Sequence, residues 1–191
     1  MNNNNNNSNN SNSKKEAQEA RDLNEKVIQI RRVTKVIKGG KRLAFRAAVV
    51  TGDRQGKVSI ALGKSREVPS AIRKAIEKGK KTYHSVKTLG GTIPHEVWGK
   101  SGASKVLLRP APEGTGVIAG GSIRTVLEMV GLRDVVAKAH GSNNTINMAK
   151  AAINALEHLM TVEQVSKIRG VQIKQRGPIG STPAQPPVQL G

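Results

Sequence analysis

The sequence is best understood from one basic segment, Arg31-Arg32-Val33-Thr34-Lys35-Val36-Ile37-Lys38-Gly39-Gly40-Lys41-Arg42-Leu43-Ala44-Phe45-Arg46. Two runs typical of strands meet there at a pair of glycines, and glycine adopts the positive φ of a tight hairpin turn without steric cost. The segment holds seven cations and no acid. Cations repel one another at this density, so the segment predicts a hairpin that enters a phosphate-lined groove. The alternative is an exposed hairpin whose charge only keeps the protein soluble.

The charge of the whole chain supports a polyanionic partner. The 191 residues carry a formal net charge of +19. Between Lys26 and Lys87 there are 18 Lys and Arg but only three acids, so most of this charge falls in one third of the chain. A local basic surface is typical of nucleic-acid-binding proteins, with an acidic membrane surface as the other candidate. The membrane is disfavoured because no basic amphipathic helix with Trp or Phe anchors is present.

Composition also narrows the class of protein. The aromatic residues Phe45, Tyr83 and Trp98 are too few for the several exposed rings with which proteins usually read single strands, so we expect recognition of backbone and shape. The absence of Cys excludes disulfides and thiolate metal sites and fits a reducing compartment. No apolar run of about 18 residues occurs, and the N-terminus lacks a basic and apolar leader, so we expect neither a membrane span nor a signal peptide.

Hydrophobic periodicity predicts an α+β fold with two small α/β sandwiches. We expect a disordered Asn-rich head and tether at 1–25, and then an RNA-binding domain at 26–91. This domain has the hairpin, a third antiparallel strand at 57–62 whose apolar side is Val58, Ile60 and Leu62, and a covering helix from Pro69 to Gly79.

The second predicted domain, residues 92–162, follows a glycine-rich boundary. Its pattern is β-β-α-β-α, with strands at 92–98, 104–109 and 133–139. One helix is capped by Ser122 and buries Ile123, Val126, Leu127 and Val130, and the last helix buries Ile146, Ala149, Ile153, Leu156 and Met160. We expect residues 163–191 to be a basic and then Pro-rich tail that is mobile towards its end.

Several motifs resemble catalytic or cofactor signatures without completing them. Gly63-Lys64-Ser65 and Gly99-Lys100-Ser101 resemble the end of a P-loop, but Val58 and Pro94 stand where its first glycine is needed. Residues 114–119 match G-x-G-x-x-A, with Asp134 at the distance of a ribose-binding acid. The prolines before these glycines and the shortness of the chain favour instead a bare loop that approaches ribose-phosphate or a partner protein. The four His are scattered without the spacing of metal ligands, so we expect no metal site. No carboxylate pair or Ser-His-Asp arrangement is visible, so we expect no catalytic site and no cofactor.

The ordered glycines and their neighbours resemble a known family. In the first half of the chain, the motifs that carry the resemblance are Lys38-Gly39-Gly40-Lys41, Gly52-Asp53, Gly56, Gly63-Lys64 and Glu67-Val68-Pro69. In the second half they are Arg109-Pro110-Ala111, Glu113-Gly114-Thr115-Gly116, Ala119-Gly120-Gly121, Arg124, Lys138-Ala139 and Gly141-Ser142. Over residues 26–160 the chain is therefore similar to the fifth protein of the bacterial-type small ribosomal subunit.

The resemblance implies a fold and a set of partners. It implies an N-terminal domain like a double-stranded-RNA-binding domain (dsRBD) and a C-terminal domain with a left-handed crossover. Members bind small-subunit (16S-type) rRNA, stabilise the head of the subunit against its body, contact small-subunit proteins four and eight near the region where mRNA enters, and help to set decoding accuracy. Neither a membrane nor a second copy of the chain is among the expected partners, and the expected location is the ribosome in the bacterial cytoplasm or, for an organellar source, the plastid stroma.

The resemblance and the charge pattern together give the candidate site. Thr34, Lys35, Lys38, Gly39 and Gly40 correspond to the family's head-contacting, spectinomycin-linked loop. The residues expected to bind RNA are Arg31, Arg32, Thr34, Lys35, Lys38, Gly39, Gly40, Lys41, Arg42, Arg46, Arg54, Lys57, Lys64 and Arg66. Gly114, Gly116 and Arg124 would lie on the accuracy-related face toward protein four.

Two other functions remain as alternatives at this point. A free regulator that binds double-stranded RNA would share the basic hairpin, and a small nicotinamide-dependent reductase would use residues 114–119. The sequence also departs from the family at Ser59 and Ala61, which stand at glycine-type positions, and at Thr145, which replaces a proline.

Overall fold

The structure is a computed structural model that describes residues 24–171. The Asn-rich head expected at 1–25 and the Pro-rich end of the expected tail lie almost entirely outside these residues. The chain divides into two compact units, of which the first contains the residues up to Ser85 together with Met129–Gly131. The second contains Val86–Glu128 and the residues from Leu132 onward. This two-unit α+β architecture confirms the predicted fold class.

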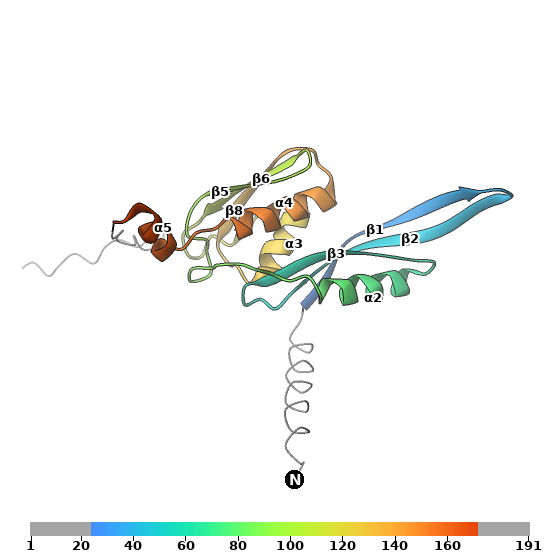
Figure 1. Cartoon of the computed structure of the whole chain (residues 1–191), viewed down its shortest axis with the longest axis horizontal. Coiled ribbons are helices and arrows are strands. Elements are labelled where there is room, and N and C mark those ends of the chain that lie inside the picture. The colour runs from blue at the N-terminus through green and yellow to red at the C-terminus, as the bar shows by residue number, and fades with distance from the viewer. Residues whose placement is uncertain (1–23, 172–191) are drawn as a thin grey trace, which may run out of the picture. The chain divides into compact units, whose positions relative to one another are not determined.

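The first unit is an antiparallel sheet with one helix (Figure 1). Its strands follow one another in the order β1-β2-β3-β4, so each pairs with its neighbour in sequence. The predicted meander is thereby confirmed, with β4 as an additional two-residue strand. The elements are β1 (Asn24–Ile37), β2 (Gly40–Gly52), β3 (Lys57–Ser65), α2 (Val68–Gly79) and β4 (His84–Ser85).

The hairpin of β1 and β2 is longer than the rest of the sheet. Its two strands pair from Asn24 with Gly52 out to Ile37 with Gly40, whereas β3 joins β2 only from Phe45 inward. The outer part of the hairpin is therefore a two-stranded ribbon, which projects past β3 and α2 in Figure 1.

Helix α2 covers one face of this sheet. Ala47 and Val49 of β2 form a buried cluster with Ala71 and Ala75 of the helix, because the helix presents small residues at four-residue spacing. The expectation that Val58, Ile60 and Leu62 form the apolar face needs correction. They pair with Gly52, Val50 and Ala48, on the opposite face from α2, so this part of the sheet has two apolar faces.

The second unit is a mixed sheet in the order β5-β6-β8-β7, in which only β7 and β8 are parallel. Helix α3 lies between β7 and β8 in sequence, so β7-α3-β8 is a crossover unit, whose left hand remains an expectation. The elements are β5 (Val97–Ser101), β6 (Ser104–Pro110), β7 (Val117–Ile118), α3 (Gly121–Val130), β8 (Val135–Gly141), α4 (Thr145–Glu157) and α5 (Val162–Arg169).

The predicted apolar stripes of both long helices are buried, with one exception. Ile123, Val126, Leu127 and Val130 of α3 and Ile146, Ala149, Ile153 and Leu156 of α4 are all buried. Met160 is 47 % exposed, and its assignment to the inner face is wrong because α4 already ends at Glu157.

Other boundaries differ from the sequence-based expectation. Ser122 is not a cap, because α3 begins at Gly121 and the Arg124 amide donates to the carbonyl of Gly120. The strand expected at 92–98 begins only at Val97. The expected tail contains α5, whose start is fixed by a reciprocal capping box between Thr161 and Gln164.

Candidate nucleic-acid interface

Three cations lie side by side across the first sheet. Arg31 of β1 pairs with Arg46 of β2, and Arg46 pairs in turn with Lys64 of β3. Residues directly opposite one another in a sheet project to the same face. The pair formed by Lys35 and Arg42 repeats this arrangement four residues nearer the tip. We call Arg31, Lys35, Arg42, Arg46 and Lys64 the cationic face.

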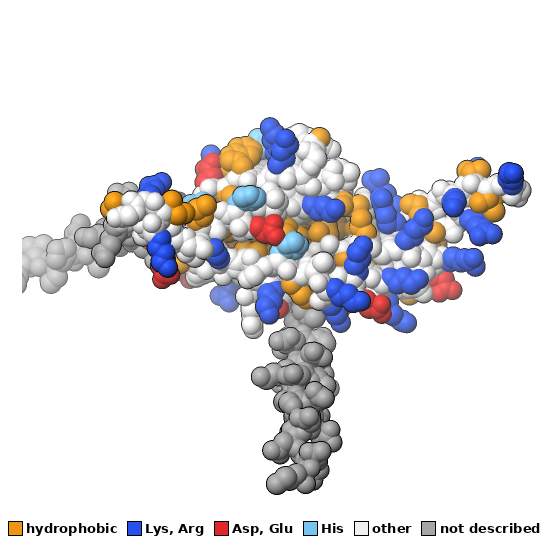
Figure 2. Space-filling model, viewed as in Figure 1, with side chains coloured by type: hydrophobic (Ala, Val, Ile, Leu, Met, Phe, Trp, Pro, Cys, Tyr) orange, Lys and Arg blue, Asp and Glu red, His pale blue; other side chains and the backbone are white. Residues whose placement is uncertain are grey.

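The cationic face is open to solvent. Four of its members are exposed, and Arg46, in the middle of the row, is half-buried. Figure 2 shows Lys and Arg side chains gathered over β1, β2 and α2, with few acidic side chains among them. Like charges directly opposite each other destabilise a sheet, so an anion that binds between them relieves their repulsion and stabilises the sheet.

The hairpin tip has the geometry that its glycines predicted. Gly39 has a φ of +88° and Gly40 a φ of +149°, and a Cβ atom on either would meet no other atom within 4 Å. The tip is therefore a bare backbone turn between Lys38 and Lys41, both of which are exposed.

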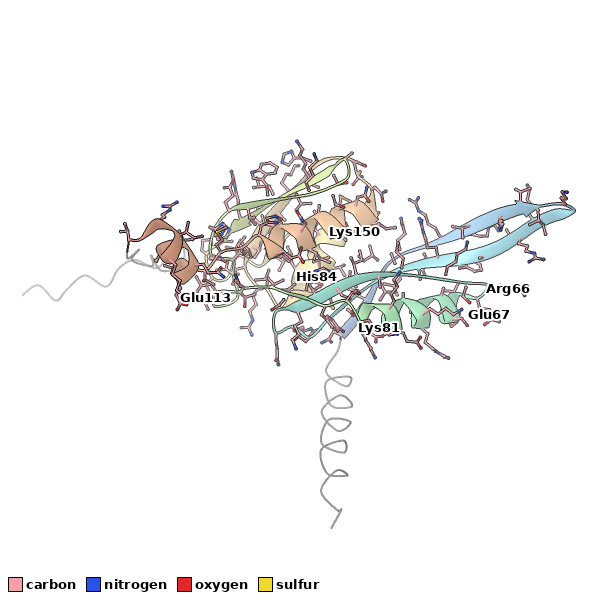
Figure 3. All side chains as sticks on the ribbon, viewed as in Figure 1. Arg66, Glu67, Lys81, His84, Glu113 and Lys150 are labelled. Carbon is pink, nitrogen blue, oxygen red and sulfur yellow. The ribbon has the colours of Figure 1, made fainter. Side chains whose placement is uncertain are left out.

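The other expected RNA-binding residues occupy different places on the first unit. Arg32 and Thr34 lie on the opposite face of the ribbon from Arg31 and Lys35. Arg54 lies in the turn at the far end of β2, and Lys57 directly follows it. At about 3.3 Å per residue, this end of β2 is roughly 40 Å from the tip. Arg66 follows β3, next to Glu67, as labelled in Figure 3. The structure thus brings Lys64 together with the hairpin residues of the cationic face, but not with Arg54 and Lys57.

The turn that carries Arg54 is held by its neighbours. Asp53 Oδ1 accepts hydrogen bonds from the amides of Gln55 and Lys57, each at 2.8 Å. Arg54 adopts a positive φ of 58°, and its amide donates to the carbonyl of Met129, which belongs to the same unit. The Arg54 side chain is exposed on this fixed turn.

The ribbon has an apolar side that the sequence analysis did not single out as part of the site. Val36 is 71 % exposed and Leu43 is 52 % exposed, and both lie on the face opposite Lys35 and Arg42. The alternation of these residues with the cations was the signal in the sequence. This face of the ribbon therefore combines exposed apolar side chains with the cations Arg32 and Lys41, opposite the cationic face.

The three residues expected on the accuracy-related face lie in or beside one loop of the second unit. Gly114 and Gly116 have positive φ values of 88° and 76°, with open space where a Cβ would be. Arg124 Nη2 donates to the carbonyl of Val117 at 2.9 Å, so this side chain braces the loop. The carboxylate of Asp134 accepts from the amide of Gly116 at 2.9 Å. In the G-x-G-x-x-A motif, Asp134 would be the ribose-binding acid. In the structure its carboxylate instead holds the loop in place.

The incomplete P-loop matches have a packing explanation. Gly63 and Gly99 are both buried where a strand meets a helix, and a Cβ on either would overlap the helix backbone. Gly63 lies against Ala71 and Ala75 of α2, and Gly99 lies against Ala151 and Ala155 of α4. Close helix packing accounts for these glycines without a nucleotide.

The described residues contain no group of three His, Asp or Glu that could hold a metal ion. Among residues 24–171, no helix has the length and apolar character needed to cross a bilayer. The closely spaced cations of the cationic face can attract a polyanion.

Comparison with known proteins covers both units. Residues 23–87 match the family model described as ribosomal protein S5, N-terminal domain, and residues 99–169 match ribosomal protein S5, C-terminal domain. A protein of Thermotoga neapolitana named small ribosomal subunit protein uS5 is 49 % identical over 154 residues, which cover 81 % of this chain and 86 % of that protein. Proteins of the same name from Thermotoga petrophila and Thermotoga maritima are each 47 % identical over the same shares of the two chains.

Proposed function

The chain belongs to the ribosomal protein S5 family, and from this premise we propose that it is a structural constituent of the small ribosomal subunit that binds small-subunit rRNA through the cationic face of its hairpin. The family is one of structural proteins and not of enzymes. The observation that carries the proposal is the row of Arg31, Arg46 and Lys64 across three strands.

The energetics of the row favour folded RNA as the partner. Phosphate groups on adjacent strands of RNA neutralise neighbouring cations and release condensed counterions when they do so. The ribbon beyond Phe45 has no third strand, and isolated two-stranded ribbons are marginally stable in water. Docking against RNA would therefore stabilise the ribbon as well as the complex.

We propose finer roles for two regions. The tip, with Thr34, Lys35, Lys38, Gly39 and Gly40, contacts the head of the subunit in its spectinomycin-linked region and holds the head against the body. The loop with Gly114, Gly116 and Arg124 faces small-subunit protein four and contributes to translational accuracy near the region where mRNA enters. Protein eight is the second protein neighbour, and the place of action is the ribosome in the cytoplasm. The open backbone at Gly114 and Gly116 supports a close approach of a partner there.

The experiment is a filter-binding titration of the full chain with a small-subunit rRNA fragment over a range of salt concentrations. We expect log affinity to fall linearly with log salt, by about 0.7 to 0.9 for each phosphate contacted. The double variant Lys35→Ala/Arg42→Ala should lower this slope by about 1.4 to 1.8, because two phosphate contacts are lost. The matched control is Lys150→Ala, an exposed lysine on α4 that Figure 3 labels.

A flat response to salt, or equal effects of the double variant and the control, would contradict the proposed RNA interface. Sedimentation of cell extracts in a sucrose gradient tests the place of action. The chain should migrate with small subunits, whereas recovery with free RNA duplexes would favour the regulator that binds double-stranded RNA.

A further inference from the structure

One face of the second unit's sheet carries exposed side chains on three neighbouring strands. Trp98 on β5 pairs with Leu107 on β6, which pairs with Lys138 on β8, so these three side chains share a face. Lys100, Lys105 and His140 form the next parallel row on the same face. We call the surface made by Trp98, Lys100, Lys105, Lys138 and His140 the aromatic face.

Helix α4 covers the opposite side of this sheet. Gly99 of β5 lies directly against the α4 backbone, where an added Cβ would come within 2.6 Å of the Ala155 Cβ. Val106 and Leu108 alternate with Lys105 and Leu107 and are fully buried on that side. All five residues of the aromatic face are exposed.

Two rings meet over the central strand of this face. The ring centroids of Trp98 and His140 are 5.3 Å apart with an interplanar angle of 44°, although β6 separates their strands. Trp98 nevertheless stays 52 % exposed, while Leu107 between the strands is only 9 % exposed. The contact with His140 orients the indole ring while much of its surface remains free for a ligand.

Three lysines surround the rings on this face, which also carries the acid Glu96 two residues before Trp98. Lys100 lies directly opposite Lys105, and Lys138 lies in the same row as Trp98, on the other side of Leu107. Arg109, at the end of β6, already pairs with Glu96 at 2.9 Å. Within the described residues, no acid forms an ion pair with the three lysines. The complementary ligand is therefore an anion that also carries a flat apolar group.

We propose that the aromatic face is a second RNA-binding surface, on which an unstacked base lies on Trp98 while Lys100, Lys105 and Lys138 hold the flanking phosphates. Base stacking on exposed aromatic rings is tolerant of sequence and combines with cations that follow the backbone. An acidic protein would satisfy the lysines but gives no reason for an oriented, half-exposed indole.

This inference shares the RNA partner of the proposed function but depends on different residues. The hairpin contacts phosphates on the first unit, whereas the aromatic face adds a base contact on the second. The two surfaces can therefore fail separately in an experiment.

The test uses the fluorescence of Trp98, which is the only Trp in the chain. The full chain is titrated with a single-stranded RNA of twelve nucleotides, with inorganic polyphosphate of matched charge, and with a poly-glutamate peptide. We expect RNA to quench Trp98, and polyphosphate and peptide to leave its emission nearly unchanged. The quenching should persist in Lys35→Ala/Arg42→Ala, even where rRNA affinity through the hairpin is lost.

Affinity in that hairpin variant gives the second readout. Trp98→Leu should weaken binding of the RNA about tenfold, and Trp98→Phe should recover most of this loss. Equal quenching by RNA and polyphosphate would overturn the base contact, and quenching by the peptide alone would identify a protein partner instead. If Trp98→Leu fails to fold, the unsubstituted chain still tests the base contact. Quenching by RNA but not by polyphosphate supports it, and no quenching by RNA contradicts it.

Discussion

The carboxylate of Asp134 accepts a hydrogen bond from the backbone amide of Gly116 at 2.9 Å, across 18 residues of sequence. Asp134 is 8 % exposed, and its own carbonyl accepts from the Thr92 hydroxyl at 2.6 Å. One buried residue therefore connects the glycine loop, the start of β8 and the segment before β5. The loop's open glycines keep a defined position because of this acid.

Replacing Asp134 should loosen the loop and lower stability. Asp134→Ala removes the acceptor and leaves the Gly116 amide without its partner, at a cost of about 1.5 to 3 kcal/mol for a hydrogen bond to a charged group. Asp134→Asn keeps an acceptor oxygen and should cost less. Urea denaturation of the three proteins measures the difference, and equal midpoints for all three would contradict this role.

Packing of α4 on β5 depends on the lack of a side chain at Gly99. In Gly99→Ala the new methyl group overlaps the α4 backbone at Ala151 and Ala155, so we expect a loss of about 3 kcal/mol, the upper range for overpacking. Gly120→Ala is the control in the same unit, because open space surrounds that position. Thermal unfolding should separate the two variants clearly, and similar midpoints would show that the helix can shift at little cost.

Much of the architecture could be predicted because local signals and packing agree. The pair Gly39 and Gly40 predicted the hairpin, and the apolar periodicity predicted the buried sides of α3 and most of α4. Strands β4 and β7 were missed because two residues are too short to show a period. Helix α5 was missed although its capping residues, Thr161 and Gln164, were a readable signal.

Some features of the candidate site could also be predicted from the sequence, and others could not. The register that places Arg31 beside Arg46 and Lys64 follows from the hairpin turn, so the sequence could have given it. The contact of Trp98 with His140 could not be foreseen, because it depends on the non-sequential order β5-β6-β8. Ser59, where the sequence departs from the family's glycine, is buried, and its hydroxyl donates to the Gly79 carbonyl at 2.9 Å. A position in the core gives no information about the RNA surface.

The hairpin tip should matter more for assembly than an equally exposed cation elsewhere. Lys38→Glu reverses a charge beside the bare turn, and we expect it to reduce incorporation into small subunits or to alter the response to spectinomycin. Lys167→Glu on α5 reverses an exposed charge and is the matched control. Incorporation is measured from gradient-purified subunits, and equal incorporation and equal spectinomycin response of the two variants would remove the special role of the tip.

Lys64 should lower the stability of the free protein while it strengthens RNA binding. It lies opposite Arg46, which already faces Arg31, so Lys64→Thr removes one of three repelling charges and keeps a residue suited to strands. We expect a gain of about 0.2 to 1 kcal/mol in the free energy of unfolding at low salt, and a smaller gain at high salt because repulsion is screened. Lys57→Thr is the control on the same strand, since Lys57 faces Ser85 instead of a cation. The same Lys64→Thr protein should bind the rRNA fragment more weakly. If Lys64→Thr changes neither the free energy of unfolding nor the affinity for the rRNA fragment, the row of cations only keeps the protein soluble.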